Sequence, residues 1–256
     1  MRAILTYHSI DGSQSPISIR PDAFAAHVRC LARGRVRVLP LVELVAEARA
    51  GGVEREDAVA ITFDDGFQSF AEHAAPLLAD HGLPATVFVV SGHAGGTSAW
   101  SGRDHPGIPT FPLMDWGTLG RLANAGIELG AHTRRHPSLD SLPATALAEE
   151  IGGSASEMES HLGRRPTAFA YPYGIAPAAA VEQVRASFAL GVTTELRALY
   201  AADDPLRIPR LDAYYLREPD GLAGWGTTRF RAYLRLRAAV RIAREQVRRG
   251  TRFGAA

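Results

Sequence analysis

Short apolar runs alternate with segments of helical periodicity along most of the chain. The apolar runs, which we expect to form strands, cover residues 3–8, 36–39, 58–63, 85–90, 126–132, 167–171, 189–193 and 206–211. The segments with helical patterns cover residues 21–32, 41–50, 70–81, 116–125, 143–162 and 178–187. Strands that are apolar over their whole length are typical of parallel sheets, so this alternation predicts an α/β fold. Seven or eight such units favour a closed barrel over a doubly wound sheet.

One irregular stretch, residues 92–112, is too long for an ordinary connection. Loops of this length in compact domains are usually functional or mobile. We expect the loop to lie over the functional site, where Trp100, His93 and His105 would line a substrate groove. The alternative is a mobile surface loop.

The composition narrows the class of protein. The 256 residues are 46% hydrophobic and 21% charged with a net charge of +1, which excludes a disordered chain and predicts no nucleic-acid partner. Cys30 is the only cysteine, so a disulfide scaffold and multi-thiolate zinc sites are excluded, and any metal needs His, Asp or Glu ligands. The first eight residues lack the features of a signal peptide, which predicts a cytoplasmic protein.

Two adjacent carboxylates, Asp64 and Asp65, follow directly on the apolar run 58–63, and Gly66 permits a sharp turn after them. Carboxylates at a strand end repel each other and lose solvation unless something neutralises them, and a cation would do so. The alternative is a solvated Asx-type turn.

His132 is the last residue of the run 126–132, and His136 follows four residues later. Both imidazoles can reach one ion, and Asp65 would complete a set of three nitrogen and oxygen ligands. Such a set leaves a coordination position open for water, as in catalytic zinc sites. Zinc, cobalt, nickel and iron all suit these ligands.

Two further strand ends carry weaker signals. Residues 171–174 (YPYG) are constrained by proline and glycine, so that a backbone N–H could point at a developing oxyanion, although an ordinary aromatic turn explains them equally well. His8 ends the first apolar run, and its side chain could point towards the same end of the barrel as the other strand-end residues.

Three motifs of the chain resemble those of the polysaccharide deacetylases, the NodB-homology enzymes of carbohydrate esterase family 4. They are TFDDG at 62–66, HTRRH at 132–136 and YPYG at 171–174. The resemblance covers residues 1–215 and implies a distorted (β/α)7 barrel with a metal-dependent hydrolase site. Residues 216–256 would form a separate basic helical tail.

The resemblance also implies roles for the matching residues. Asp64 would be the general base, and Asp65, His132 and His136 would hold the divalent metal, with zinc expected first. The backbone N–H of Tyr173 would help to bind the oxyanion.

Two departures from the family pattern need replacements. Ala170 stands where the third motif usually has an arginine, and the usual C-terminal Leu-x-His is absent because His161 is the last histidine. The segment around His8 resembles the start of the circularly permuted poly-N-acetylglucosamine deacetylases, in which this histidine is the general acid. Arg210, which follows a late apolar run, is the candidate for the missing arginine.

We therefore expect an enzyme that removes the N-acetyl group from an amino-sugar-containing saccharide or glycoconjugate. One alternative is a C–N hydrolase of the same superfamily that opens cyclic amides or imides. The other is a saccharide-binding protein without activity. Retention of both Asp64 and Asp65 counts against a mere binder, whereas the missing third-motif arginine counts for it.

The C-terminal tail is strongly basic. Residues 229–252 contain nine arginines and one acidic residue, Glu245, with apolar residues at helical spacing between them. We expect a terminal helix that packs on the barrel and leaves its arginines in solvent. The alternative is a helix that makes peripheral contact with the inner membrane surface.

Overall fold

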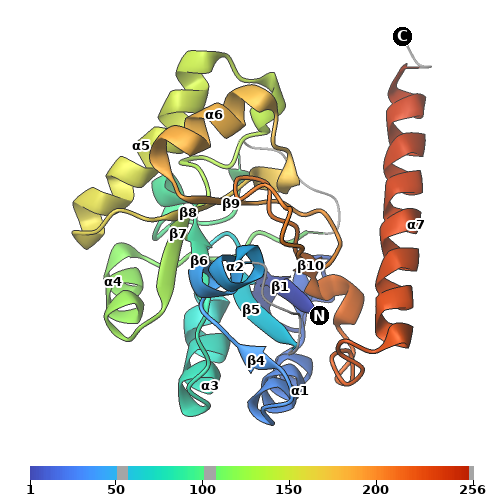
Figure 1. Cartoon of the computed structure of the whole chain (residues 1–256). Helices are drawn as coiled ribbons and strands as arrows, with labels where there is room; N and C mark the ends of the chain where they lie inside the picture. Colours follow the sequence, from blue (N-terminus) through green and yellow to red (C-terminus); the bar gives the residue numbers. More distant parts are fainter. Residues whose placement is uncertain (51–56, 101–107, 254–256) are drawn as a thin grey trace.

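Figure 1 shows the computed structural model of the chain, which describes residues 1–50, 57–100 and 108–253. The apolar runs form one parallel sheet with the order β10-β1-β5-β6-β7-β8-β9, and β4 pairs with β5. The strands of this sheet are β1 (Arg2–Tyr7), β4 (Arg37–Val38), β5 (Ala58–Phe63), β6 (Thr86–Val89), β7 (Glu128–Ala131), β8 (Ala168–Ala170), β9 (Leu190–Val192) and β10 (Leu211–Asp212). Seven of these strands curl into a distorted barrel, which confirms the predicted (β/α)7 architecture.

Side chains alternate between two cores because successive residues of a strand point to opposite faces. In β5, Ala58 and Ala60 belong to the cluster inside the barrel, whereas Val59, Ile61 and Phe63 belong to the cluster outside it. Small alanines suit the inside of a narrow barrel. The inner cluster also contains the buried face of α2 (Leu41–Arg49), which lies at the centre of the ring of strands in Figure 1.

The remaining helices cover the outer face of the sheet, except for the C-terminal helix, which comes after the last strand. They are α1 (Pro21–Ala32), α3 (Ala75–Asp80), α4 (Trp116–Asn124), α5 (Ala144–Leu162), α6 (Ala178–Ser187) and α7 (Thr228–Phe253). Short helical turns are Phe70–Ala74, Ser91–His93, Leu139–Ser141, Pro172–Gly174 and Ala213–Leu216. The predicted bounds of α1 and α6 are confirmed, and α2, α4 and α5 differ from the prediction by one residue at one end.

The segment predicted as a helix over residues 70–81 is helical over residues 70–80, but it is not a regular α-helix throughout. A π-helical turn, Phe70–Ala74, precedes α3, and Pro76 occupies the first turn of α3. Because proline has no N–H to continue the ladder of hydrogen bonds, the helical turn widens before it.

The strand predicted over residues 206–211 is also displaced. Residues 206–210 are irregular apart from a bridge between Ile208 and Val192, and β10 begins only at Leu211. Pro209 has no N–H for a strand ladder. The irregular segment therefore closes the barrel between β9 and β10. Two short strands that the sequence pattern did not predict, β2 (Ser9–Ile10) and β3 (Ser18–Ile19), pair beside the barrel.

The C-terminal helix α7 stands at one side of the barrel in Figure 1. Phe230 and Leu234 bury their side chains in the outer core cluster, and the Tyr233 hydroxyl donates a hydrogen bond to the Tyr215 carbonyl. The described helices include none with the length and apolar composition needed to cross a bilayer.

A buried histidine fixes the end of β1, just before His8. The hydroxyl of Tyr7 lies 3.1 Å from Nδ1 of His27, and Nε2 of His27 lies 3.0 Å from the carbonyl oxygen of Glu218. That carbonyl can only accept, so Nε2 donates to it and Nδ1 accepts from Tyr7. Burial lowers the pKa of His27, and hydrogen bonds to the carbonyls of Glu218 and Leu216 offset this only partly. The native protein therefore holds His27 neutral.

This burial predicts a pH-dependent stability. Below pH about 6.5 the unfolded chain binds a proton at His27 that the native state does not bind, so stability is present above this pH and lost as the pH falls. We expect His27→Gln to reduce the loss in the free energy of unfolding between pH 7.5 and 5.5 by about 1 kcal/mol. Urea unfolding with a chelator present measures this difference. His73→Gln, at an exposed histidine, is the control and should keep the wild-type pH dependence. Equal pH dependence in His27→Gln and wild type would contradict the assignment.

Candidate active site

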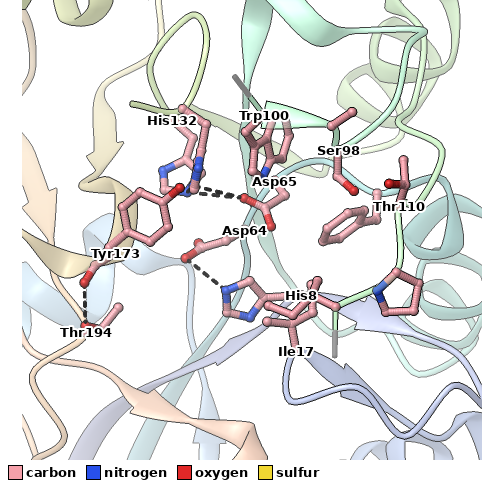
Figure 2. A pocket seen from close by; sticks show the side chains of 15 residues that line it. His8, Ile17, Asp64, Asp65, Ser98, Trp100, Thr110, His132, Tyr173 and Thr194 are labelled. Atoms are coloured by element: carbon pink, nitrogen blue, oxygen red, sulfur yellow. Dashed lines mark hydrogen bonds and ion pairs between the residues drawn. The ribbon is translucent and has the colours of Figure 1, made fainter. Parts of the chain in front are cut away.

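The predicted site residues meet at the carboxyl edge of the barrel, where parallel strands end together. They line or adjoin one cavity of about 340 Å³ (Figure 2). The cavity is lined by His8, Ile17, Asp64, Asp65, Phe67, Ser98, Ala99, Trp100, Ile108, Pro109, Thr110, His132, His136, Tyr173 and Thr194. Asp64 follows β5 by one residue, and strand alternation turns its side chain to the same side as Thr62, into the barrel mouth.

Asp65, His132 and His136 form a compact buried cluster. Oδ1 of Asp65 lies 3.4 Å from Nε2 of His132 and 3.5 Å from Nε2 of His136, and the two Nε2 atoms are 3.2 Å apart. Nδ1 of His132 lies 2.8 Å from the Ala170 carbonyl oxygen and donates to it, which leaves Nε2 as the ring atom that could bind a metal.

The cluster fits a divalent cation. One ligand atom from each residue lies within 4.8 Å of the others, and all three residues are buried. Among the described residues, Oδ1 of Asp65 and Nδ1 of His136 are buried and have no hydrogen-bond partner, which is costly in a folded protein. Burial lowers the pKa of His136 to about 3, so its ring is neutral and able to act as a ligand. These residues could hold a metal through nitrogen and oxygen atoms.

A buried glutamate of α5 fixes the loop between the two histidines. Oε2 of Glu150 accepts hydrogen bonds from the backbone N–H groups of Arg134 (3.0 Å) and Arg135 (2.9 Å), and Oε1 accepts one from Nε of Arg135. The hydroxyl of Thr133 accepts a hydrogen bond from the backbone N–H of His136. Glu150 could not be predicted from the sequence, because an acidic residue in a long helix gives no local signal of a contact with a loop 15 residues earlier.

Asp64 is held by a buried arginine. Both terminal nitrogens of Arg210 donate to its carboxylate at 2.7 Å, and Nε of Arg210 donates to the Thr193 carbonyl at 2.9 Å. The guanidinium is fully buried and lies over the ring of Phe88, with 5.5 Å to the ring centroid. Burial alone would raise the pKa of Asp64, but the charge and hydrogen bonds of Arg210 outweigh it and hold the pKa well below its usual range. Asp64 is therefore ionised at neutral pH.

His8 faces Asp64 from the end of β1. Its Nε2 lies 4.0 Å from Oδ2 of Asp64, and its side chain is 20% exposed, so one side of the ring reaches the cavity. Figure 2 shows the imidazole opposite the Asp65 and His132 side of the cavity.

Tyr173 forms the wall next to the histidines. Its ring packs edge-on against His136, its φ of 59° lies in the left-handed region, and its carbonyl accepts a hydrogen bond from Thr194 Oγ1 at 3.3 Å. Gly174 follows with a φ of +72°, and a Cβ there would lie 2.1 Å from Thr194 Oγ1, so only glycine fits.

Described residues on both sides of the long loop line the cavity, among them Trp100 and Thr110. The indole of Trp100 stacks on His136 with 4.9 Å between ring centroids, and His93 packs edge-on with Trp100. His93 is not among the cavity-lining residues, and His105 lies outside the described residues. Trp116 stacks on His161 on the outer surface, away from the cavity.

The family follows from the sequence comparison. The family model for polysaccharide deacetylase matches residues 51–191, more than half of the 256 residues. The chain therefore belongs to the polysaccharide deacetylases, the NodB-homology hydrolases of carbohydrate esterase family 4.

Two curated relatives extend the comparison. YxkH of Bacillus subtilis (strain 168), by name a provisional polysaccharide deacetylase, is 26% identical over 193 residues, or 75% of this chain and 64% of that protein. The chain thus spans less than two thirds of that relative's length. The poly-beta-1,6-N-acetyl-D-glucosamine N-deacetylase of Staphylococcus epidermidis is 24% identical over 221 residues, or 80% of this chain and 73% of the relative.

Two solved structures share the fold. IcaB from Ammonifex degensii superposes with a TM-score of 0.71 at 26% identity, covering 87% of this chain and 95% of that one. The Streptococcus pyogenes deacetylase PplD in complex with acetate gives a TM-score of 0.73 at 21% identity, covering 87% and 96%.

The buried ion pair predicts a specific pattern of stability. Removing one partner of a buried pair leaves an uncompensated charge and costs about 3–5 kcal/mol, so Arg210→Met should be strongly destabilised. Adding Asp64→Asn should restore part of this loss, because the stranded carboxylate disappears. A double-mutant cycle by urea unfolding measures the recovery. Arg207→Met, at an exposed neighbour, should change stability by less than about 0.5 kcal/mol. Additive losses in the double variant would contradict a direct charge pairing.

Proposed function

We propose that this protein is a metal-dependent N-deacetylase of an amino-sugar-containing saccharide or glycoconjugate. The observation that carries the proposal is the ionised, arginine-held Asp64 beside the cluster of Asp65, His132 and His136 at one cavity. A hydrolytic site needs a base next to an electrophilic centre, whereas a saccharide-binding protein does not. The names of the Staphylococcus relative and of the acetate-bound Streptococcus structure agree with this chemistry.

Asp65, His132 and His136 would hold the metal, which we expect to be zinc, with cobalt, nickel and iron as alternatives. When bound, a metal of this kind polarises the amide carbonyl and makes water more acidic. The chain's own residues would move the protons and orient the groups.

Asp64 would accept a proton from the attacking water, since Arg210 keeps it ionised and fixes both of its oxygens. The backbone N–H of Tyr173 would donate to the oxyanion that develops on the acyl oxygen. His8, across from Asp64, would give a proton to the leaving nitrogen. Arg210 would act through Asp64 as a positioning residue, taking the place of the arginine that Ala170 replaces.

Release of acetate from N-acetylglucosamine oligomers tests the proposal. We expect the zinc-loaded protein to release acetate, the chelated protein to release almost none, and Asp64→Asn to lose at least about 100-fold of kcat because it lacks a general base. Metal content by mass spectrometry is the control, because Asp64→Asn should still bind one zinc. Tight saccharide binding without product would support the binding-protein alternative, and turnover of cyclic imides instead would support the other hydrolase.

His8 can be tested separately. His8→Ala should keep the metal and the saccharide affinity but lose about 100-fold in kcat, because the leaving amine is no longer protonated. Substrates with a better leaving group should recover much of the loss. Near-normal kcat on the amide would remove His8 from the mechanism.

The Glu150 contacts predict an effect on metal affinity. Glu150→Gln keeps the shape but leaves one acceptor oxygen in place of two, so the backbone N–H groups of Arg134 and Arg135 and the Nε of Arg135 can no longer all find an acceptor. We expect the zinc dissociation constant to rise by about 10- to 100-fold, as for other groups that support metal ligands. Glu149→Gln, at the exposed neighbouring glutamate, is the matched control and should leave zinc affinity unchanged. Competition with a chromophoric chelator measures both. Equal affinities would show that Glu150 does not organise the metal ligands.

A further inference from the structure

The exposed side of α7 carries a second apolar stripe. Phe230 and Leu234 face the core and are buried. Ala232, Leu236, Ala239, Val240 and Ala243 are exposed and follow one another at the spacing of a single helix face. We call these five residues the outer stripe. It lies on the side of α7 away from Phe230 and Leu234.

The outer stripe is unusual for this molecule. Of the seven large hydrophobic side chains exposed in the described part of the chain, four lie on α7. Two of these four, Leu236 and Val240, belong to the outer stripe, and Leu236 is 63% exposed. Clusters of exposed apolar side chains commonly mark binding surfaces.

The charge of the molecule is divided sharply between α7 and the rest. Nine of the 28 basic residues and one of the 27 acidic residues lie in 229–252, so this segment carries +8 and the remainder of the chain −7. At 3.6 residues per turn, Arg235 lies on one side of the outer stripe and Arg244 on the other. Both side chains are exposed.

We propose that the outer stripe of α7 binds the surface of an anionic lipid bilayer. Apolar side chains flanked by arginines match the boundary between acyl chains and negatively charged headgroups. A second copy of α7 is a poor occupant, because two segments of charge +8 repel each other. A purely acidic polymer would satisfy the arginines but would leave Leu236 and Val240 in water.

The contacts of Arg241 connect this surface to the cavity. One terminal nitrogen of Arg241 donates to the Thr194 carbonyl and the other to Thr194 Oγ1, each at 2.9 Å, and Thr194 lines the cavity. Binding of α7 would therefore hold this wall of the cavity beside the bilayer. The membrane proposal does not depend on the proposed deacetylation.

Cosedimentation of the full chain with vesicles tests the proposal. We expect binding to vesicles of phosphatidylcholine with phosphatidylglycerol, little binding to phosphatidylcholine alone, and weakening by salt. Leu236→Gln with Val240→Gln should weaken binding more than tenfold, and Val42→Gln, at an apolar residue of α2 that is 41% exposed, should not. Glutamine keeps helix propensity, so circular dichroism should be unchanged.

A second pair of variants tests the charges. Arg235→Gln with Arg244→Gln should weaken binding about tenfold or more and reduce its dependence on salt, whereas Arg33→Gln with Arg164→Gln should not. No binding of the wild type at low salt would overturn the proposal. Two results together would identify an acidic polymer as the partner instead. Leu236→Gln with Val240→Gln would leave vesicle binding unchanged, and the protein would bind polyglutamate or single-stranded DNA as tightly as it binds vesicles. Concentration-dependent dimerisation abolished by Leu236→Gln with Val240→Gln would identify a second copy.

Discussion

The buried pair of Arg210 and Asp64 is the interaction on which the rest of the site depends. A carboxylate at a barrel mouth loses its solvation, and only a fixed countercharge keeps it ionised there. Arg210 reaches it from the segment before β10, spans the interior above Phe88, and donates to both of its oxygens. The small inner alanines, such as Ala170, leave room for this arginine. The position of the Asp64 carboxylate therefore depends on the small side chains that line the barrel interior.

The site also holds backbone strain that neighbouring contacts support. Among the described residues other than glycine, Asp65, Thr133, His136 and Tyr173 lie at the site with φ between 58° and 71°. Such conformations cost on the order of 1 kcal/mol each and persist only where the surroundings enforce them. In the loop between His132 and His136, the hydrogen bonds that Glu150 accepts hold the backbone in this conformation. Tight turns of this kind direct consecutive side chains into one cavity, which regular strand geometry cannot do.

The parts of the structure that depend on local pattern could be predicted from the sequence. Apolar runs placed the strands, and polar residues at strand ends identified Asp64, Asp65, His132 and His136 as neighbours. Glu150 depends on a contact across the fold that no local pattern records. The displaced β10 has a similar cause, because Leu206 and Ile208 are buried by barrel closure, with the single Ile208–Val192 bridge in place of a continuous strand over residues 206–210. Burial gives the same apolar pattern in both cases.

The position of the arginine couples the site to closure of the barrel. The backbone N–H of Arg210 donates to the Glu195 carbonyl, and its Nε donates to the Thr193 carbonyl just after β9. The residue that orients Asp64 therefore also joins the segments between β9 and β10, where strand pairing is reduced to the Ile208–Val192 bridge. An arginine at the position of Ala170 would lie on a strand that is already paired on both sides. If the segments between β9 and β10 separated, Arg210 would move and Asp64 would lose the arginine that orients it. The stability of the barrel and the orientation of Asp64 must therefore change together.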